Sequence, residues 1–174
     1  MTSEVASLIS GLVRDVPDFP EPGIVFKDIA PLLADRTCLE LVVNELTSLA
    51  GGAQIVAGVE ARGFLLAGAV AVAAGCGLVP VRKAGKLPPP TVRKAYQLEY
   101  GRAEIEVPVQ VLAGKRVFLV DDVLATGGTL AAAVDLIEAA GGSVAGIGVL
   151  LEIGVLGGAA RLAHLAPLSA LLRV

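Results

Sequence analysis

Aromatic residues, cysteine and histidine are all scarce in this sequence of 174 residues. It contains four Phe, two Tyr and no Trp, so a buried core has to be built mainly from aliphatic side chains. The two cysteines, Cys38 and Cys76, lack CxxC spacing, and the single histidine, His164, cannot complete a zinc site with them. We therefore expect reduced, buried thiols, a structural or surface role for His164, and no metal site built from side chains alone.

An excess of positive charge is also missing. Lys and Arg number 14 against 17 Asp and Glu, which gives a net charge of −3. A protein that binds nucleic acid through its phosphates needs a surplus of cations, so we expect no nucleic-acid partner. Glu4 precedes any basic residue, and no long apolar run leads to a small-residue cleavage site, so we expect a cytoplasmic protein without a secretory signal.

One uncharged stretch, residues 63–81, has nearly the length that spans a bilayer. It is rich in Ala, Gly and Val, is interrupted at residues 75–77 by Gly-Cys-Gly, and carries Pro80 near its end. These breaks favour a buried helix over residues 63–74, followed by a buried strand over residues 78–82. A bilayer protein is therefore the weaker alternative, and we expect no membrane span.

Strands and helices alternate along the rest of the chain. Apolar residues make up 55% of the sequence and charged residues 18%, enough for a buried core. The patterns predict helices over residues 5–13, 37–50 and 129–140, with Asp35 or Thr37 as a cap for the second, and buried strands over 54–59, 116–121 and 143–151. This order predicts an α/β fold, with a mostly parallel central sheet flanked by helices, in a single domain of residues 1–174.

Charged residues gather in the one interruption of this alternation, residues 83–106. Two short alternating stretches, 96–100 and 103–107, are joined by Gly101 and Arg102 and follow a run of three prolines at 88–90. We expect an antiparallel excursion outside the sheet, able to close as a flexible hood over residues 87–104.

The segment most informative about chemistry is residues 117–129, where a buried strand is followed by two acids, a small-residue turn and the start of a helix. Ligands of open α/β sheets bind where such strands end. Gly127 and Gly128 let the backbone approach an anion, and helix-start amides with the hydroxyls of Thr126 and Thr129 can donate to phosphate oxygens. The alternative is an ordinary turn in which a threonine caps the helix.

Two acids, Asp121 and Asp122, precede this turn and suit the hydroxyls of a sugar. Neighbouring residues of a strand point to opposite faces, so both acids share one site only if the chain bends at Asp122. Otherwise they are simply solvated. Because the GxxxxGK[ST] and GxGxxG motifs are both absent, we favour a ribose-phosphate site of another kind.

Residues 117–129 resemble the phosphoribosyl pyrophosphate signature of the type I phosphoribosyltransferases. Three further segments are similar to the adenine-specific members of that family: FPEPGIVFKDI at 19–29, EARGF at 60–64, and RKAGKLP at 82–88 running on to YQLEYG at 96–101. The resemblance implies the fold of that family and transfer of the 5-phosphoribosyl group from phosphoribosyl pyrophosphate to N9 of adenine. The products are AMP and pyrophosphate, a purine salvage reaction. It also implies Mg²⁺ bound through phosphoribosyl pyrophosphate and a homodimer in which part of the cation set crosses the interface.

The resemblance also implies roles for individual residues. The 5′-phosphate is held by Ala125, Thr126, Gly127, Gly128 and Thr129, the ribose hydroxyls by Asp121 and Asp122, and the pyrophosphate by Arg62, Arg82, Lys83 and Lys86. Arg62 lies beside a Glu60–Ala61 peptide that family members often keep cis. Without the resemblance, the basic residues at 82–86 read equally well as a solvated loop.

Adenine is assigned by the same resemblance to Val25, Phe26 and Lys27, although many relatives carry Arg where Lys27 stands, and lysine lacks the planar fork of arginine. Glu99 in the hood is implied as the acid or base at N9, with Tyr100 beside it. On its own, Glu99 reads as a solvated glutamate.

Two alternative functions remain open at this point. One is a phosphoribosyltransferase for a different base. The other is a non-catalytic regulator that binds phosphoribosyl pyrophosphate and controls a partner or DNA. Only eighteen residues precede Phe19 and the net charge is negative, so a DNA-binding module has little room or charge here.

Overall fold

The N-terminal quarter of the chain forms helices and a small ribbon beside the main sheet. The computed structural model describes residues 3–98 and 101–174. Helix α1 (Ser3–Leu12), strands β1 (Arg14–Pro17) and β2 (Val25–Asp28), and helices α2 (Ala30–Ala34) and α3 (Arg36–Leu49) follow in order. Strand β1 pairs antiparallel with β2, with Pro17 opposite Val25. Proline is tolerated there because it ends a two-stranded ribbon that has free edges.

The central sheet has seven strands in the order β5-β6-β4-β3-β7-β8-β9. Strands β3 (Ile55–Val59), β4 (Gly77–Lys83), β7 (Arg116–Leu124), β8 (Ser143–Glu152) and β9 (Leu168–Arg173) are mutually parallel. The predicted α/β class with a mostly parallel sheet is confirmed. Strand β9 was not predicted, because a short edge strand within an Ala/Leu-rich stretch lacks the period-2 pattern of a half-buried strand.

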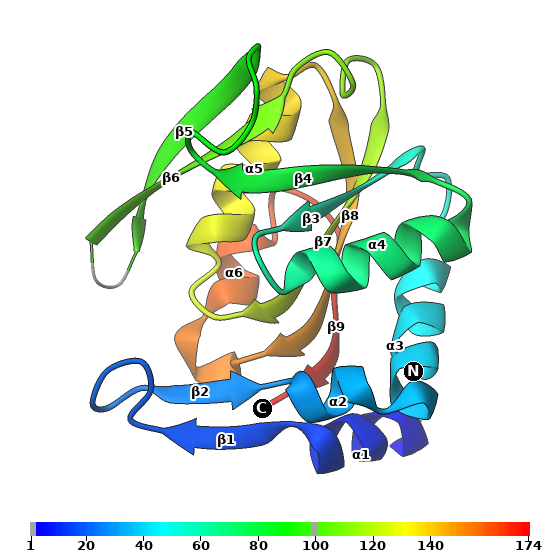
Figure 1. Ribbon diagram of the computed structural model, residues 1–174, viewed down its shortest axis with the longest axis vertical. Coiled ribbons are helices and arrows are strands. Elements are labelled where there is room, and N and C mark those ends of the chain that lie inside the picture. Colours follow the sequence, from blue (N-terminus) through cyan, green and yellow to red (C-terminus); the bar gives the residue numbers. More distant parts are fainter. Residues whose placement is uncertain (1–2, 99–100) are drawn as a thin grey trace.

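The hood differs from its prediction in two ways. Strands β5 (Thr91–Leu98) and β6 (Gly101–Pro108) form the expected antiparallel pair, but β6 also pairs with β4, through Arg82 opposite Glu106. The hairpin therefore extends the central sheet and does not lie outside it (Figure 1). The predicted turn at Gly101 and Arg102 is also wrong, because both residues belong to β6.

Helices cover both faces of the sheet (Figure 1). Helix α4 (Gly63–Ala74) has the bounds that the sequence predicts, and α5 (Gly128–Ala139) follows β7. A 3-10 turn, η1 (Gly154–Leu156), and helix α6 (Gly158–Leu162) precede β9. As predicted, Asp35 caps α3, its carboxylate accepting from the Cys38 amide at 2.8 Å. Within the described ranges, none of the helices has the length and apolar character needed to span a membrane.

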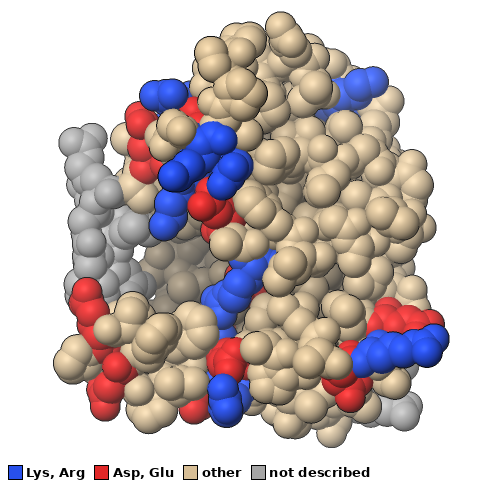
Figure 2. Space-filling view, in the orientation of Figure 1, with Lys and Arg blue, Asp and Glu red and all other residues tan. Residues whose placement is uncertain are grey.

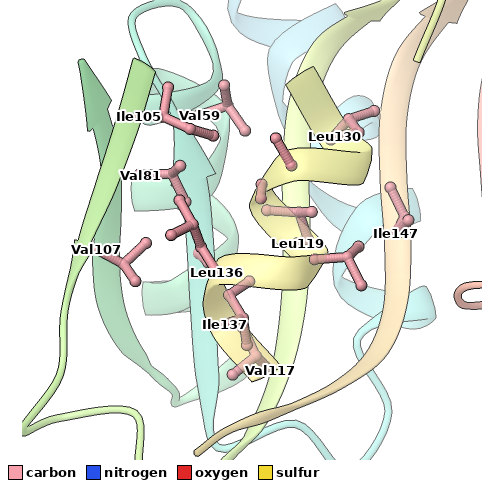
Figure 3. Close-up of a cluster of buried hydrophobic side chains, with 14 of the residues drawn as sticks. Val59, Val81, Ile105, Val107, Val117, Leu119, Leu130, Leu136, Ile137 and Ile147 are labelled. Atoms are coloured by element: carbon pink, nitrogen blue, oxygen red, sulfur yellow. The ribbon is translucent and has the colours of Figure 1, made fainter. Parts of the chain in front are cut away.

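Two aliphatic clusters form the core, one on each face of the sheet. Figure 3 shows the first, in which α5 packs against β3, β4, β6, β7 and β8. The second lies under α1 to α4. Among the described residues, Phe118 is the one fully buried aromatic side chain. Cys38 is buried as expected, whereas Cys76 is only half-buried, which corrects the prediction of two buried thiols, and His164 is exposed.

Candidate active site

The turn after β7 encloses a cavity of about 300 Å³. The lining includes all five residues predicted for the phosphate, which we call the cradle (residues 125–129), together with Ile24, Asp121, Val123, Leu124 and Leu130. Gly127 is the N-cap of α5 with φ of +77°, and no side chain caps the helix. The alternative with threonine as a cap therefore does not hold. The uncapped amides and the dipole of α5 suit an anion placed in this cavity.

The cradle rests on the start of α6, a contact that sequence reasoning missed. A Cβ at Gly158 would lie 2.2 Å from the carbonyl oxygen of Ala125, and a Cβ at Gly127 would lie 3.0 Å from the carbonyl oxygen of Gly158. Two backbones touch here without side chains between them. Only the Gly157-Gly158 pair in the sequence hinted at such a close approach.

The two acids do meet, because β7 changes its alternation at them. Before the acids, the even-numbered residues Phe118 and Val120 belong to the cluster under α4. After the acids, the odd-numbered Val123 packs against that cluster, and Leu124 belongs to the cluster around α5. The switch falls at Asp121 and Asp122, the bend that the sequence analysis required for a shared site.

Both carboxylates lie beside the first turn of α4. A Cβ at Gly63 would lie 2.9 Å from Asp121 Oδ1, and Asp122 Oδ2 is 2.7 Å from Arg62 Nε. Burial and the neighbouring Asp122 carboxylate raise the pKa of Asp121 well above its ordinary value, against the lowering effect of the Asp122 amide, which donates to Asp121 Oδ1 at 2.9 Å.

Arg62 joins the acids to the N-terminal ribbon. Besides its ion pair with Asp122, its Nη1 donates to the Lys27 carbonyl at 2.9 Å, and its guanidinium carbon lies 4.5 Å from the centroid of the Phe26 ring. The Glu60–Ala61 peptide before it is cis, as the resemblance implies. These contacts leave some of its five N–H donors free, so Arg62 can still bind an anion.

Of the three ribbon residues predicted for adenine, only Phe26 lines a second hollow, of about 350 Å³, together with Val16, Phe19 and Asp28. Val25 is exposed, and the Phe26 ring meets Phe19 edge-on at 5.2 Å. Lys27 Nζ donates to both carboxylate oxygens of Asp15, at 2.7 and 2.9 Å. The side chain of residue 27 is therefore held within the ribbon, where a lysine fits without the fork of an arginine.

The predicted pyrophosphate cations lie at the carboxyl end of β4. Glu60 accepts from the Lys83 amide at 3.0 Å and from Arg82 Nε at 3.3 Å, and Arg82 Nη1 donates to the Lys86 carbonyl at 3.3 Å. The Lys83 and Lys86 side chains are exposed. Figure 2 shows basic side chains gathered beside a hollow on the face of the molecule that is turned to the viewer.

A buried acid, Glu106, anchors the loop that carries these cations. Its side chain is fully buried and accepts from the amides of Lys86 (2.7 Å) and Leu87 (2.8 Å), from Thr91 Oγ1 (3.2 Å) and from Arg93 Nε (3.0 Å). Burial alone would raise its pKa, but the two amides, Thr91 and Arg93 together lower it below its ordinary value. Sequence reasoning missed Glu106, because in an alternating stretch it falls on the polar face with Glu104.

The hood contacts the cradle through β5. The hydroxyl oxygens of Thr129 and Tyr96 are hydrogen-bonded at 3.1 Å, and Lys94 forms an ion pair with Asp135 of α5. The two predicted hood residues of the reaction, Glu99 and Tyr100, lie outside the described residues. Within the described part of the chain, no group of three or more His, Cys, Asp or Glu side chains could hold a metal ion.

An uncapped helix start facing a small cavity, with paired acids and cations around it, is the arrangement expected of a protein that binds a sugar phosphate. The model of the phosphoribosyl transferase domain family matches residues 35–165, so the chain belongs to this class of enzymes.

More specific relatives narrow the assignment. Adenine phosphoribosyltransferase from Mycobacteroides abscessus is 55% identical over 170 residues, which cover 97% of this chain and 96% of the relative. The crystal structure of adenine phosphoribosyltransferase from Rhodothermus marinus is 43% identical, with a TM-score of 0.93 over 99% of this chain and 100% of that one. The Giardia lamblia enzyme, crystallised with 9-deazaadenine, is 38% identical, with a TM-score of 0.93 over 97% of each chain.

Within the type I phosphoribosyltransferases, the chain thus belongs to the adenine phosphoribosyltransferases. It converts adenine and phosphoribosyl pyrophosphate to AMP and pyrophosphate.

Proposed function

We propose that phosphoribosyl transfer to adenine takes place over the cavity at the end of β7, with the 5′-phosphate seated in the cradle (residues 125–129). The observation that carries this assignment is the cavity itself, because its lining includes all five cradle residues together with Asp121. The first-turn amides of α5 have no capping side chain, and a phosphate dianion satisfies them while it gains from the helix dipole.

The ribose then lies over the paired acids. Asp121 lines the cavity, and the adjacent Asp122 carboxylate is paired with Arg62. Carboxylates accept hydrogen bonds from sugar hydroxyls, and a charged acceptor makes such bonds stronger than a neutral one. Because Asp122 and Arg62 neutralise each other in part, Arg62 stays in place while its remaining donors face the pyrophosphate.

Departure of pyrophosphate leaves an oxocarbenium-like ribosyl centre, as in glycoside hydrolysis. Arg62, Arg82, Lys83 and Lys86 are proposed to stabilise the charge that develops on the leaving group. Their placement supports this role, since Glu60 and Glu106 fix the loop through its backbone and leave the Lys83 and Lys86 side chains exposed.

Mg²⁺ fits this donor set as an ion carried in by the substrate. It binds readily through phosphates, waters and one or two carboxylates, and when bound it neutralises charge on the pyrophosphate oxygens. Asp121 and Asp122 are the carboxylates near enough to contribute. An all-protein site is not needed for such an ion.

Adenine is proposed to lie against the segment from Val25 to Lys27, near the hollow beside Phe26, with Glu99 as the acid or base at N9. Arg62 already joins Phe26 and the Lys27 carbonyl to the acids, which supports placing the base next to the ribose. Closure of the hood with Glu99 and Tyr100 would exclude water, which otherwise captures the ribosyl centre.

A homodimer through α4 completes the proposal. Leu65 and Val72, seven residues apart on one face of α4, are 60% and 85% exposed, and Leu78 of β4 beside them is 51% exposed. Helices that are apolar on every face are usually buried, so this face suits a second copy of the chain. The surface over α4 in Figure 2 is accordingly almost free of charge.

A cytoplasmic location remains a proposal, supported by the two free cysteines.

The test of the function is pyrophosphate release with the donor, Mg²⁺ and a panel of bases: adenine, hypoxanthine, guanine, xanthine, uracil and orotate. We expect release with adenine only. Thr126→Ala and Asp122→Ala should weaken binding of the donor, whereas Glu99→Ala should lower kcat more than it raises either KM. AMP formation by Glu99→Ala at the rate of the parent protein would remove Glu99 from its role.

A further inference from the structure

The hydroxyl groups of Tyr96 and Thr129 form the contact that joins the hood to the phosphate cradle. Tyr96 belongs to β5 and Thr129 to the first turn of α5, 33 residues further along the chain, and their oxygens are 3.1 Å apart. Thr129 lines the cavity, whereas the Tyr96 ring packs against the cluster around α5. A second contact, the ion pair of Lys94 with Asp135, joins the same strand and helix away from the cavity.

The direction of this hydrogen bond matters for a phosphate ligand. Each hydroxyl group has one proton to donate and can accept from others. If Thr129 donated its proton to Tyr96, 3.1 Å away, it would offer only lone pairs to the cavity. The oxygens of a phosphate dianion are acceptors as well. Thr129 can bind the phosphate only by turning its proton into the cavity.

The contact persists with a phosphate in the cavity if Tyr96 is the donor. Once the Thr129 proton points to the phosphate, its oxygen is free to accept, and the Tyr96 hydroxyl can donate to it with both oxygens in place. The result is a chain from Tyr96 through Thr129 to the phosphate. Hydrogen bonds in such a chain polarise one another, and the one ending on an anion is stronger than a neutral bond.

We infer that Tyr96 is a positioning residue that couples the hood to the occupied cradle: its phenol donates to Thr129, which leaves the Thr129 proton for a bound phosphate. The inference rests on the proposed seat of the 5′-phosphate. It assigns to the hood a preference for the loaded enzyme, since the contact that docks β5 on α5 is stronger with phosphate present.

The scarcity of aromatic residues gives a direct spectroscopic test. Tyr96 and Tyr100 are the two tyrosines and there is no Trp, so a Tyr100→Phe chain carries Tyr96 as its single phenol. The ultraviolet band of a phenol moves to longer wavelength when its hydroxyl donates a hydrogen bond. We expect the Tyr96 band of Tyr100→Phe to lie at the wavelength of a donating phenol at saturating ribose 5-phosphate, with saturation measured by calorimetry.

The matched variant is Thr129→Val in the same background, which keeps the shape of the side chain and removes the hydroxyl. There the band should lie at shorter wavelength at saturating ribose 5-phosphate. A Tyr96 band in Tyr100→Phe at the same or a shorter wavelength than in the Thr129→Val variant would overturn the role of Tyr96 and leave the cradle standing. Binding that is equally tight in Thr126→Ala and Thr129→Val would instead show that the phosphate sits elsewhere.

Kinetics provide an independent measurement in the otherwise unaltered chain. Tyr96→Phe keeps the ring and removes one hydrogen bond, so KM for phosphoribosyl pyrophosphate should rise roughly 2- to 10-fold, with KM for adenine little changed. Lys94→Ala is the control, because it cuts the other contact between β5 and α5 without touching the cavity. An equal rise in both variants would reduce Tyr96 to a general docking contact and contradict the inference.

Discussion

The carboxyl group of Asp121 lies where burial favours its protonated form. Its pKa in the folded chain is raised well above the ordinary 3.8. Between these two values the folded state binds more protons than the unfolded state, so stability falls as the pH rises through that window. The protein therefore keeps at neutral pH an acid that destabilises it, which is typical of residues retained for ligand binding.

Asp121→Asn should separate stability from binding. Removing the buried titratable group should stabilise the protein at neutral pH by about 1 kcal/mol, or roughly 2–4 °C in Tm, while weakening binding of the donor. The change in Tm is measured by thermal unfolding at neutral pH and at a pH near 3.8, the ordinary pKa of the group. The gain in stability should vanish at the lower pH. Glu40→Gln, at an exposed position on α3, is the control and should change little. A lower Tm for Asp121→Asn at neutral pH would contradict this account.

Gly158 supports the cradle by having no side chain. In Gly158→Ala the new Cβ would lie 2.2 Å from the Ala125 carbonyl oxygen, so the backbone of the cradle or of α6 must move. We expect KM for the donor to rise at least about tenfold and stability to fall by about 1–3 kcal/mol. Gly11→Ala, in α1 with nothing within 4 Å, is the matched control and should be neutral or slightly stabilising. Unchanged donor binding in Gly158→Ala would show that the cradle does not depend on α6.

Local chemistry in one segment was predictable, while contacts between distant segments were not. The strand, acids, glycines and threonines of residues 117–129 lie together in the sequence, and Asp121, both glycines and both threonines line one cavity in the structure. The pairing of Lys27 with Asp15 and the support from Gly158 join segments that no local pattern connects. Glu106 was missed for another reason, since periodicity places it on the polar face and cannot foresee that four donors will cover it.

At the scale of elements, the sheet and the hood are one structure. Strand β6 pairs with both β4 and β5, so the hairpin that carries the hood is built onto the edge of the catalytic sheet. Helix bounds such as those of α4 followed from the sequence, because Gly63 and Gly75 mark its ends. The hairpin turn did not, because Gly101 reads as a turn residue whether it ends a strand or starts one.

Glu106→Gln tests whether Glu106 positions Lys83 and Lys86 by holding the backbone of the loop at residues 86–87. The amide keeps one acceptor but places N–H groups against donors, so stability should fall by about 1–3 kcal/mol, and KM for the donor should rise more than KM for adenine. A carboxyl group with a lowered pKa stabilises the fold at pH values above its ordinary pKa, here 4.5. This contribution is lost as the pH falls through the lowered pKa. The variant should therefore resemble the parent protein in acid.

The measurements are urea unfolding across this pH range and steady-state kinetics. Glu104→Gln is the matched control, since Glu104 lies two residues earlier on the same strand and is exposed. Equal effects of the two variants on donor KM would remove Glu106 from this role.

At the scale of the whole molecule, the exposed apolar face of α4 is the surface proposed to bind a second copy of the chain. Val72→Glu places a charge on the face proposed for the second copy, where burying it is costly. We expect dimers to dissociate, and donor KM to rise if cations cross the interface. Analytical ultracentrifugation gives the mass. Val111→Glu, 46% exposed in the loop after β6, should leave the mass unchanged. A monomeric parent protein, or a dimeric Val72→Glu, would contradict the proposed interface.

The contact between Gly158 and Ala125 also bears on how the protein is made. During synthesis, the cradle proposed for the phosphate leaves the ribosome well before α6, and its backbone lacks this contact until the later turn emerges. A nascent chain halted between α5 and α6 would thus contain every residue of the cradle without the backbone that supports it. Binding competence is then acquired only after α6 has emerged.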